Sequence, residues 1–297
     1  MTKPPISDKI KRGFTGLTLL GKMYRFIAGD WRRLNWLKEH RQNGVPFEWS
    51  KNNDYLDWFY KYRPHLAKFK DIHKGQDCFI IGNGPSLNQT DLNLLNGYHV
   101  FGLNKIHLIF EKYPRLKLSY HVTVNPLVIE QIQREVEEGV FDCPTFLSYQ
   151  GSKGVNFSSK NVYKLLTCGK WSFYKNVMEP INEGYTVTYV AMQLAYYMGY
   201  KNVFLVGVDH NFSQVGKPNE LQDFKGDDHN HFHPDYFKGQ LWHLADLEGN
   251  EASYALAKHQ FHEDGREIFN ATVGGKLNIF KRITFEEALQ RAKKMPE

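Results

Sequence analysis

The chain has 297 residues, of which 41% are hydrophobic and 15% aromatic, and a mean hydropathy of -0.53. This composition excludes an intrinsically disordered chain and predicts a folded protein with a polar surface, made of one large domain or one domain with an appendage. The net charge of +6 is unevenly distributed, because residues 1–75 hold sixteen Lys/Arg against seven Asp/Glu, a net +9, while the rest of the chain carries -3. Positive charge confined to one segment argues against a nucleic-acid-binding protein.

The three cysteines and the apolar runs indicate where such a protein resides. Cys78, Cys143 and Cys168 are far apart and include no Cys-x-x-Cys pair, which fits a reducing cytosol and neither a disulfide framework nor a thiolate metal site. The sequence has no signal-peptide pattern and no apolar run of about 18 residues that would cross a bilayer. We therefore expect a cytoplasmic protein, with a peripheral place at the inner membrane face as an option.

The N-terminal segment reads as a basic helical extension. From Ser7 to His40, apolar residues recur at roughly helical spacing between Lys and Arg, which predicts one or two amphipathic helices. Residues 1–45 would contact an anionic membrane peripherally, bind an acidic partner, or pack on the remaining chain with their charges in water. The aromatic segment Tyr55–Tyr62 predicts another short helix, and Lys70–Gly75 a linker, so we divide the chain into an extension over 1–75 and a domain over 76–297.

After Gly75 short apolar runs alternate with helical segments. Asn125 before Pro126 is a helix N-cap, Thr186 opens an apolar stripe that ends at Gly199, and Thr284 begins a capping box. The predicted strands are Cys78–Ile81, His99–Leu103, Leu118–Val124, Pro144–Leu147 and Val203–Val206. This order predicts an α/β, Rossmann-like fold whose mostly parallel sheet has helices on both faces.

The turn after the first strand is the first candidate site. Gly82, Asn83, Gly84 and Ser86 follow Ile81 directly, and two glycines at this place let a phosphate or a ribose approach the backbone. The turn has neither the P-loop lysine nor the Gly-x-Gly-x-x-Gly pattern. A purely structural turn remains the alternative.

Polar side chains also follow three other strands. Asn104, Asn125 and Asp209 stand at carboxyl ends of predicted strands, which is the edge where open α/β sheets bind ligands. A carboxamide can donate to a phosphate and accept from a ribose hydroxyl. Helix capping is the alternative for both asparagines, and Asp209 would accept ribose hydroxyls, bind a metal or cap a loop.

The densest histidine cluster follows Asp227 and Asp228. His229, His231 and His233 alternate along the chain, so they would share one face of an extended segment. Three interpretations stay open, namely a general base, a metal site and a solvated loop.

Several of these motifs together resemble the bacterial sialyltransferases that decorate lipooligosaccharide. The resemblance rests on FIIGNGPSL, Asn104, the Asn125 segment, Thr186–Gly199 and the strand that ends at Asp209, in this order between about residues 77 and 212. It implies a nucleotide-sugar-binding transferase domain with a lid, here about 210–245, a CMP-activated sialic acid as donor, no metal or other cofactor, and a histidine base.

The same resemblance implies roles for individual residues. Asn83 and Ser86, beside Gly82 and Gly84, would contact the donor at the first turn, and Asn104 and Asn125 would hold nucleotide and phosphate. Thr188 stands where the family has a Ser-Gly pair that binds cytidine, and Asp209 is a further donor-binding candidate. The base would be His231, with His233 second, and Tyr236 would correspond to a lid tyrosine that grips phosphate.

The C-terminal segment Gly265–Leu277 resembles a broader group, which shares the Gly-x-Gly-Pro-Ser-Leu turn seen here at Gly82–Leu87. That group is related to hydroxymethylpterin pyrophosphokinase and includes flagellin-modifying glycosyltransferases. Arg266, Asn270 and Lys276 would then serve a ligand, unless Gly274-Gly275 is only a tight turn between strands.

Three functions follow as expectations. The first is a glycosyltransferase of lipopolysaccharide biosynthesis, which moves an acidic sugar of sialic or related ulosonic type from CMP to a hydroxyl of a cell-surface glycan. The second is a diphosphotransferase that uses ATP and a divalent cation bound by Asp209, Asp227 and Asp228. The third is a nucleotide-binding protein without catalysis.

Overall fold

The computed structural model describes residues 29, 34–36, 38–213 and 216–295. Most of the helix predicted over Ser7–His40 lies outside these residues. The chain forms two compact units, Met1–Lys61 and Tyr62–Glu297. Residues 62–75, which the sequence assigned to the extension, therefore fall in the second unit.

The described part of the first unit is helical and aromatic. It contains the 3-10 helix η1 (Phe47–Trp49) and α3 (Asn53–Lys61), which confirms the helix predicted around Tyr55. The ring of Tyr55 stacks on Trp49 and Phe59, with centroids 4.9 and 5.6 Å away. Ring stacking thus holds this short helix to the turn before it.

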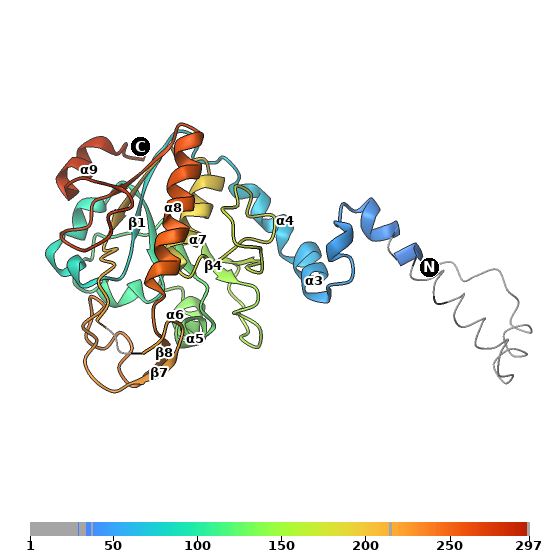
Figure 1. The fold of residues 1–297 in the computed structure, drawn as a ribbon, viewed down its shortest axis with the longest axis horizontal. Coiled ribbons are helices and arrows are strands. Elements are labelled where there is room, and N and C mark those ends of the chain that lie inside the picture. The colour runs from blue at the N-terminus through green and yellow to red at the C-terminus, as the bar shows by residue number, and fades with distance from the viewer. Residues whose placement is uncertain (1–28, 30–33, 37, 214–215, 296–297) are drawn as a thin grey trace, which may run out of the picture. The chain divides into compact units, whose positions relative to one another are not determined.

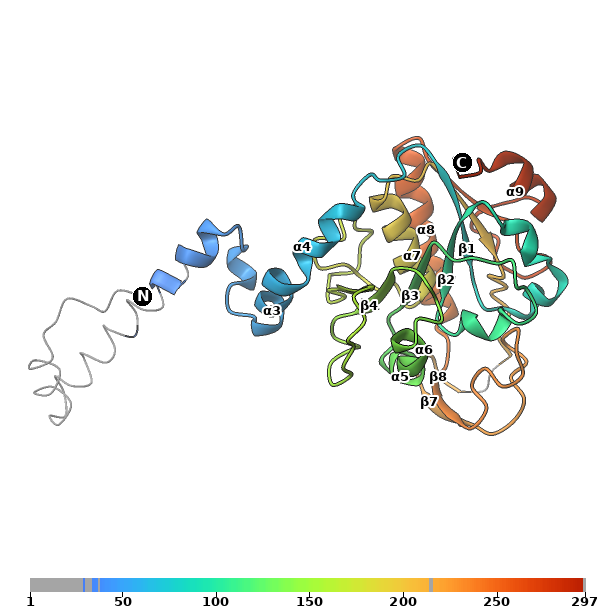
Figure 2. The same ribbon diagram turned by 180° about the vertical axis from the view of Figure 1, so that it is seen from behind.

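The second unit is built on one sheet of eight parallel strands (Figures 1 and 2). Its order is β10-β9-β6-β1-β2-β3-β4-β5, and every pairing between neighbours is parallel. The strands are β1 (Asp77–Ile81), β2 (His99–Leu103), β3 (Tyr120–Thr123), β4 (Thr145–Ser148), β5 (Val162–Leu165), β6 (Asn202–Val206), β9 (Glu267–Asn270) and β10 (Lys281–Arg282). The predicted fold class and all five predicted strands are confirmed.

Helices and 3-10 turns cover both faces of this sheet. The α-helices are α4 (Arg63–Leu66), α5 (Pro126–Gln131), α6 (Gln133–Glu137), α7 (Val187–Tyr197), α8 (Leu247–Glu263) and α9 (Phe285–Arg291). The 3-10 helices are η2 (Ala67–Phe69), η3 (Pro85–Gln89), η4 (Leu92–Leu95) and η5 (Ile106–Ile109). α7 packs on β1, β2 and β3 and is joined by α8, while α9 contributes to the core on the other face.

Local signals in the sequence set the helix ends. Asn125 caps α5 by accepting from the backbone N–H groups of Leu127 and Val128, and Thr186 caps α7 in the same manner. The capping box at Thr284 is present. The helix predicted from Asn125 to Glu138 is interrupted at Ile132, which separates α5 from α6.

The predicted linker Lys70–Gly75 is not a free connection. Asp71 N donates to Tyr197 O at 3.0 Å, and His73 N donates to Met198 O at 2.8 Å. These backbone bonds fix the segment against the C-terminal end of α7.

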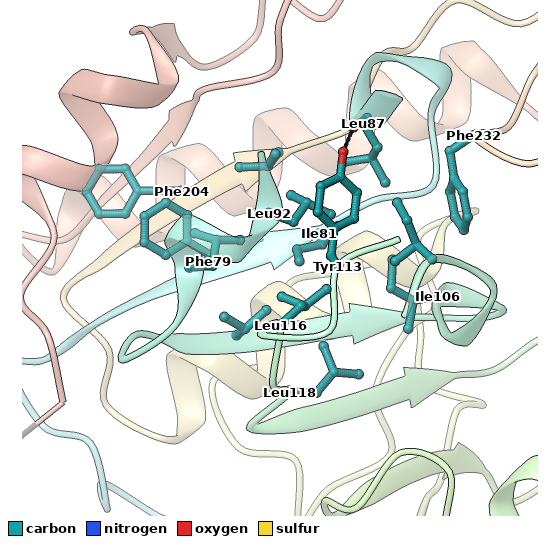
Figure 3. Close-up of a cluster of buried hydrophobic side chains, with 14 of the residues drawn as sticks. Phe79, Ile81, Leu87, Leu92, Ile106, Tyr113, Leu116, Leu118, Phe204 and Phe232 are labelled. Carbon is teal, nitrogen blue, oxygen red and sulfur yellow. Dashed lines mark hydrogen bonds between the residues drawn. The ribbon is translucent and has the colours of Figure 1, made fainter. Parts of the chain in front are cut away.

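The core on one side of the sheet is shown in Figure 3. Phe79 from β1 lies against Phe204 from β6, with ring centroids 5.2 Å apart, and Ile81 and Leu87 of the same cluster are fully buried. Tyr113 donates from its hydroxyl to Leu87 O at 3.4 Å. Burial on both faces explains why β1 and β6 are continuous apolar runs in the sequence.

The strand order places a topological switch point between β1 and β6. The chain adds β2 to β5 on one side of β1 and then returns to add β6, β9 and β10 on the other. Open α/β sheets bind ligands outside the carboxyl ends of the strands at such a point. The Gly82–Leu87 turn leaves β1 at this position.

The segment predicted as a lid contains an antiparallel hairpin of β7 (Leu221–Phe224) and β8 (Gln240–His243). In Figure 1 it lies beyond the sheet, near α5 and α6. Among the described helices, none has the length and apolar character needed to cross a bilayer.

Candidate active site

The turns after β1 and β6 interlock through their backbones. Gly82 N donates to Val206 O and Gly84 N to Gly207 O, both at 2.8 Å. A Cβ at Gly82 would lie 2.4 Å from Gly207 O, and one at Gly84 would lie 1.8 Å from Asp209 Oδ2. The packing of the protein itself therefore accounts for both glycines, which is the structural alternative that the sequence left open. Their presence alone does not indicate a ligand.

Ser86 and Asp209 hold each other across the same junction. The Ser86 hydroxyl donates to Asp209 Oδ2 at 2.7 Å, and its backbone N–H donates to Oδ1 at 3.2 Å. Burial raises the pKa of Asp209 above its ordinary value, and the bonds from Ser86 oppose this rise. Two residues predicted to contact the donor thus contact one another.

A cavity of about 580 Å³ opens over this junction. Its walls come from the turns after β1, β2, β3 and β6, the N-terminal ends of α5, α7 and α8, and the lid. The predicted site residues that line it are Gly82, Asn83, Gly84, Asn104, Asn125, Thr188, Asp209 and His231. Ser86, His233 and Tyr236 are not among its lining residues.

The cavity is rich in amides and, in the described part of the chain, has no lysine or arginine in its lining. Its asparagines are Asn83, Asn104, Asn125, Asn182, Asn211, Asn219, Asn230 and Asn250. The positive ends of two long helices, α7 and α8, also face it. Anionic groups of a ligand would therefore be held by amide and backbone N–H groups instead of ion pairs.

Asn104 is fixed in an unusual backbone conformation at the end of β2. Its φ is +50°, in the left-handed region, which asparagine tolerates better than most residues. Its side-chain oxygen accepts from the Thr123 hydroxyl at 2.9 Å, and its carbonyl lies 2.7 Å from His121 Nε2. Burial lowers the pKa of His121 to about 3, so this imidazole is neutral and donates to the carbonyl.

His231 is the histidine of the cluster that faces the cavity. Its Nδ1 lies 2.8 Å from Asp228 Oδ2, and the side chains of His231 and Asp228 are 9% and 0% exposed. The imidazole stacks on the Tyr236 ring at 4.1 Å and has Trp242 at its edge. With Nδ1 committed to a buried carboxylate, Nε2 is the nitrogen available to a substrate.

The other two histidines of the cluster lie elsewhere. His229 is exposed. His233 borders a separate small hollow beside Asn88 and Lys112. In the described residues no three His, Cys, Asp or Glu side chains gather in a geometry that holds a metal ion.

The segment that carries His231 is attached to the Gly82–Leu87 turn and to the residues that follow β2. Phe232 N donates to Asn83 O at 3.0 Å, and the Asn88 amide donates to Phe232 O at 2.8 Å. Lys105 Nζ donates to Tyr236 O at 2.8 Å and also bonds Gln240, and burial lowers the pKa of this lysine to about 8. Tyr236 is fully buried behind His231, so it supports the imidazole instead of facing the cavity.

The residues that the resemblance to the pyrophosphokinase-related group singled out make contacts within the fold. Arg266 donates to Tyr196 O at 2.7 Å and lies over the Tyr196 ring, and the buried Asn270 donates to Leu277 O at 2.9 Å. Gly274 and Gly275 both have positive φ in the turn between β9 and β10. Arg266, Asn270 and Lys276 do not line the cavity.

Sequence reasoning missed several groups at the site. Glu183 lines the cavity, close to the hydroxyls of Thr167 and Ser148, and burial raises its pKa. α8 contributes its N-cap Asp246 and, about two turns further along, Tyr254. Neither was found, because α8 itself had not been predicted.

Comparisons with known proteins give structural likeness only. No protein-family model matches the chain, and no curated protein matches its sequence. The chain is similar to the MAf glycosyltransferase from Magnetospirillum magneticum AMB-1, with 13% identity, a TM-score of 0.48, and coverage of 78% of this chain and 38% of that one. It thus spans well under half of that protein's length.

Two sialyltransferase structures are also similar. The sialyltransferase CstII from Campylobacter jejuni, in complex with cytidine-5'-monophosphate, shows 12% identity and a TM-score of 0.43 over 71% of this chain and 86% of that one. A variant of sialyltransferase Cst-II in complex with CMP shows 13% identity and a TM-score of 0.39 over 70% and 89%. At these levels the likeness carries no assignment, and function is argued from the cavity.

Proposed function

We propose that the protein is a glycosyltransferase that moves an acidic sugar from a CMP-activated donor to a hydroxyl of a cell-surface glycan. One observation carries the proposal. A histidine oriented by a buried carboxylate, His231 with Asp228, faces a cavity at the topological switch point of the sheet. This arrangement suits a base that takes a proton from a hydroxyl near neutral pH.

The chemistry would be a single displacement. His231 Nε2 takes the proton of the acceptor hydroxyl as its oxygen forms a bond to the anomeric carbon of the donor sugar. The bond from that carbon to the phosphate oxygen breaks, and CMP leaves with the electron pair. Asp228 stabilises the imidazolium that forms, since its carboxylate lies 2.8 Å from Nδ1.

Amide and hydroxyl groups in the lining would recognise the nucleotide without ion pairs. Asn83, Asn104 and Asn125 present amides at the ends of β1, β2 and β3, and Thr188 lies in the first turn of α7. The positive end of the α7 dipole favours a phosphate there. We propose that these groups hold CMP and that its departure needs no metal.

The diphosphotransferase alternative would use three carboxylates as metal ligands. Asp209 is held by Ser86, Asp227 pairs with Lys238 at 3.0 Å, and Asp228 pairs with His231. Since each carboxylate has a different partner, their arrangement favours the glycosyltransferase proposal.

The test uses the full chain with CMP-Neu5Ac and related CMP-sugars, and it measures CMP release with and without EDTA. We expect turnover that EDTA leaves unchanged and that His231→Ala lowers about 10²- to 10⁴-fold, the usual contribution of a general base. His233→Ala is the matched control and should stay within about threefold of wild type. Turnover that His231→Ala leaves intact would refute the base assignment, and wild-type protein that binds no CMP in calorimetry would refute the donor.

A further inference from the structure

Two large aromatic side chains stand exposed at the mouth of the cavity. Trp171 is 55% and Tyr185 57% exposed, and both line the cavity. Neither belongs to the Gly82–Leu87 turn or to the lid, and the mechanism above does not use them. Large aromatic side chains that line a cavity and stay exposed commonly belong to a binding site.

Both side chains are supported by α8. Tyr185 lies so close to Gly249 that a Cβ there would come within 2.6 Å of its ring, so only glycine leaves room. Trp171 Nε1 is 3.4 Å from the buried hydroxyl of Ser253, one helical turn further along. The two aromatic side chains thus contact positions one turn apart on the same helix.

The backbone under Tyr185 is also constrained. Its φ is +63°, a conformation that costs free energy for a bulky side chain and that clusters at functional sites. In the orientation that satisfies its amide, Asn250 donates to Tyr185 O at 3.0 Å. The fold therefore fixes Tyr185 at the rim, where its ring stays exposed.

We propose that Trp171 and Tyr185 form a platform on which a sugar ring of the acceptor glycan stacks. The proposal rests on the proposed function. The cavity has a volume of about 580 Å³, and pockets for one small ligand have volumes of about 300–1,000 Å³. A nucleotide-sugar would therefore fill most of the cavity. The glycan beyond the attacked hydroxyl must then extend over the rim, and the apolar C–H face of a sugar is suited to an exposed aromatic ring.

The test is binding of the full chain to an array of oligosaccharides, without donor or turnover. Wild type should bind a subset of glycans, and Trp171→Ala and Tyr185→Ala should each weaken that binding about tenfold. Trp171→Tyr should retain most of it. Leu94→Ala, which alters an exposed apolar residue outside the cavity, is the matched control.

Calorimetry with CMP on the same variants separates the platform from the donor site. Unchanged CMP affinity with weakened glycan binding supports the platform. A parallel loss of CMP affinity would show that the rings hold the nucleobase, and this would overturn the platform. The platform would also be overturned if the wild-type protein bound no glycan, or if the variants bound glycans as well as wild type does. Glycan binding that depends on Trp171, in a protein that binds no CMP, would sustain the platform while the proposed donor fails.

Discussion

Replacing Asp228 with asparagine tests the pairing on which the proposed chemistry depends. Asp228 Oδ2 lies 2.8 Å from His231 Nδ1, and Oδ1 accepts from Asn230 N at 2.9 Å. An amide of the same shape can keep only one of these acceptor oxygens. If its NH2 group faces Nδ1, the imidazole must carry its proton on Nε2, and it can no longer act as a base towards the acceptor.

The expected loss of rate can be estimated from the hydrogen bond between Asp228 and His231. A hydrogen bond to a charged group contributes about 1.5–3 kcal/mol, which is about 10- to 150-fold in rate. The wrong tautomer raises the loss towards about 10⁴-fold. We therefore expect Asp228→Asn to lower kcat about 10²- to 10⁴-fold and to change the donor KM less than about threefold.

The assay is steady-state CMP release, accompanied by thermal unfolding and by the ¹⁵N shifts of the His231 ring. Asp227→Asn is the control, because that neighbouring carboxylate is exposed and paired with Lys238. Asp228→Asn protein that is folded, has the altered tautomer and still turns over within threefold of wild type would refute the reasoning.

Three further outcomes are expected. Gly82→Ala should lose about 1–3 kcal/mol of unfolding free energy, because its Cβ would strike Gly207 O, whereas Gly226→Ala, with open space around it, should change little in the same denaturant titration. Burial lowers the pKa of His99 to about 4. As the pH falls from about 6.5 to 4, the unfolded state therefore binds a proton that the folded state does not, and the free energy of unfolding should fall by up to about 1.4 kcal/mol per pH unit. A His99→Phe variant should show a flatter profile, and an unchanged slope would contradict this. The donor KM should change less than about twofold between 0.05 and 0.5 M salt, since no lysine or arginine among the described residues lines the cavity, and a steep rise would point to ion pairs instead.

The sequence predicts those parts of the fold that depend on neighbouring residues. After a polar first residue, β1, β2 and β6 have no polar side chain, because both faces of these strands are buried. The caps at Asn125, Thr186 and Thr284 act within a few residues of themselves. For the same reason the alternation of strand and helix was enough to predict the parallel sheet.

α8 was missed because its buried positions carry little hydrophobic signal. Two of its five buried residues, Asn250 and Ser253, are polar, so the apolar stripe on the face that packs is short. β5 was missed since two of its four residues are half-exposed. In both elements tertiary packing decides a conformation that the local pattern does not favour.

At the site, residue types were easier to predict than contacts. The spacing of Asp228 and His231 is local, yet three similar histidines follow one another. The bond of His231 to Asp228 and its packing on Tyr236 distinguish it from the other two. The bond between Ser86 and Asp209 joins residues 123 positions apart in the sequence. Such a pair follows from the strand order and not from any motif.

Asn83 connects the two halves of the proposed reaction. Its carbonyl accepts from Phe232 N, next to His231, so the turn that would hold the donor also positions the proposed base. Its side-chain oxygen is buried and has no hydrogen-bond partner in the described part of the chain. An unpaired buried acceptor lowers the free energy of unfolding by about 1–3 kcal/mol. A hydroxyl or amino group of the CMP-sugar that donated to this oxygen would recover that free energy. Binding of the donor would then strengthen the turn that holds His231 in place.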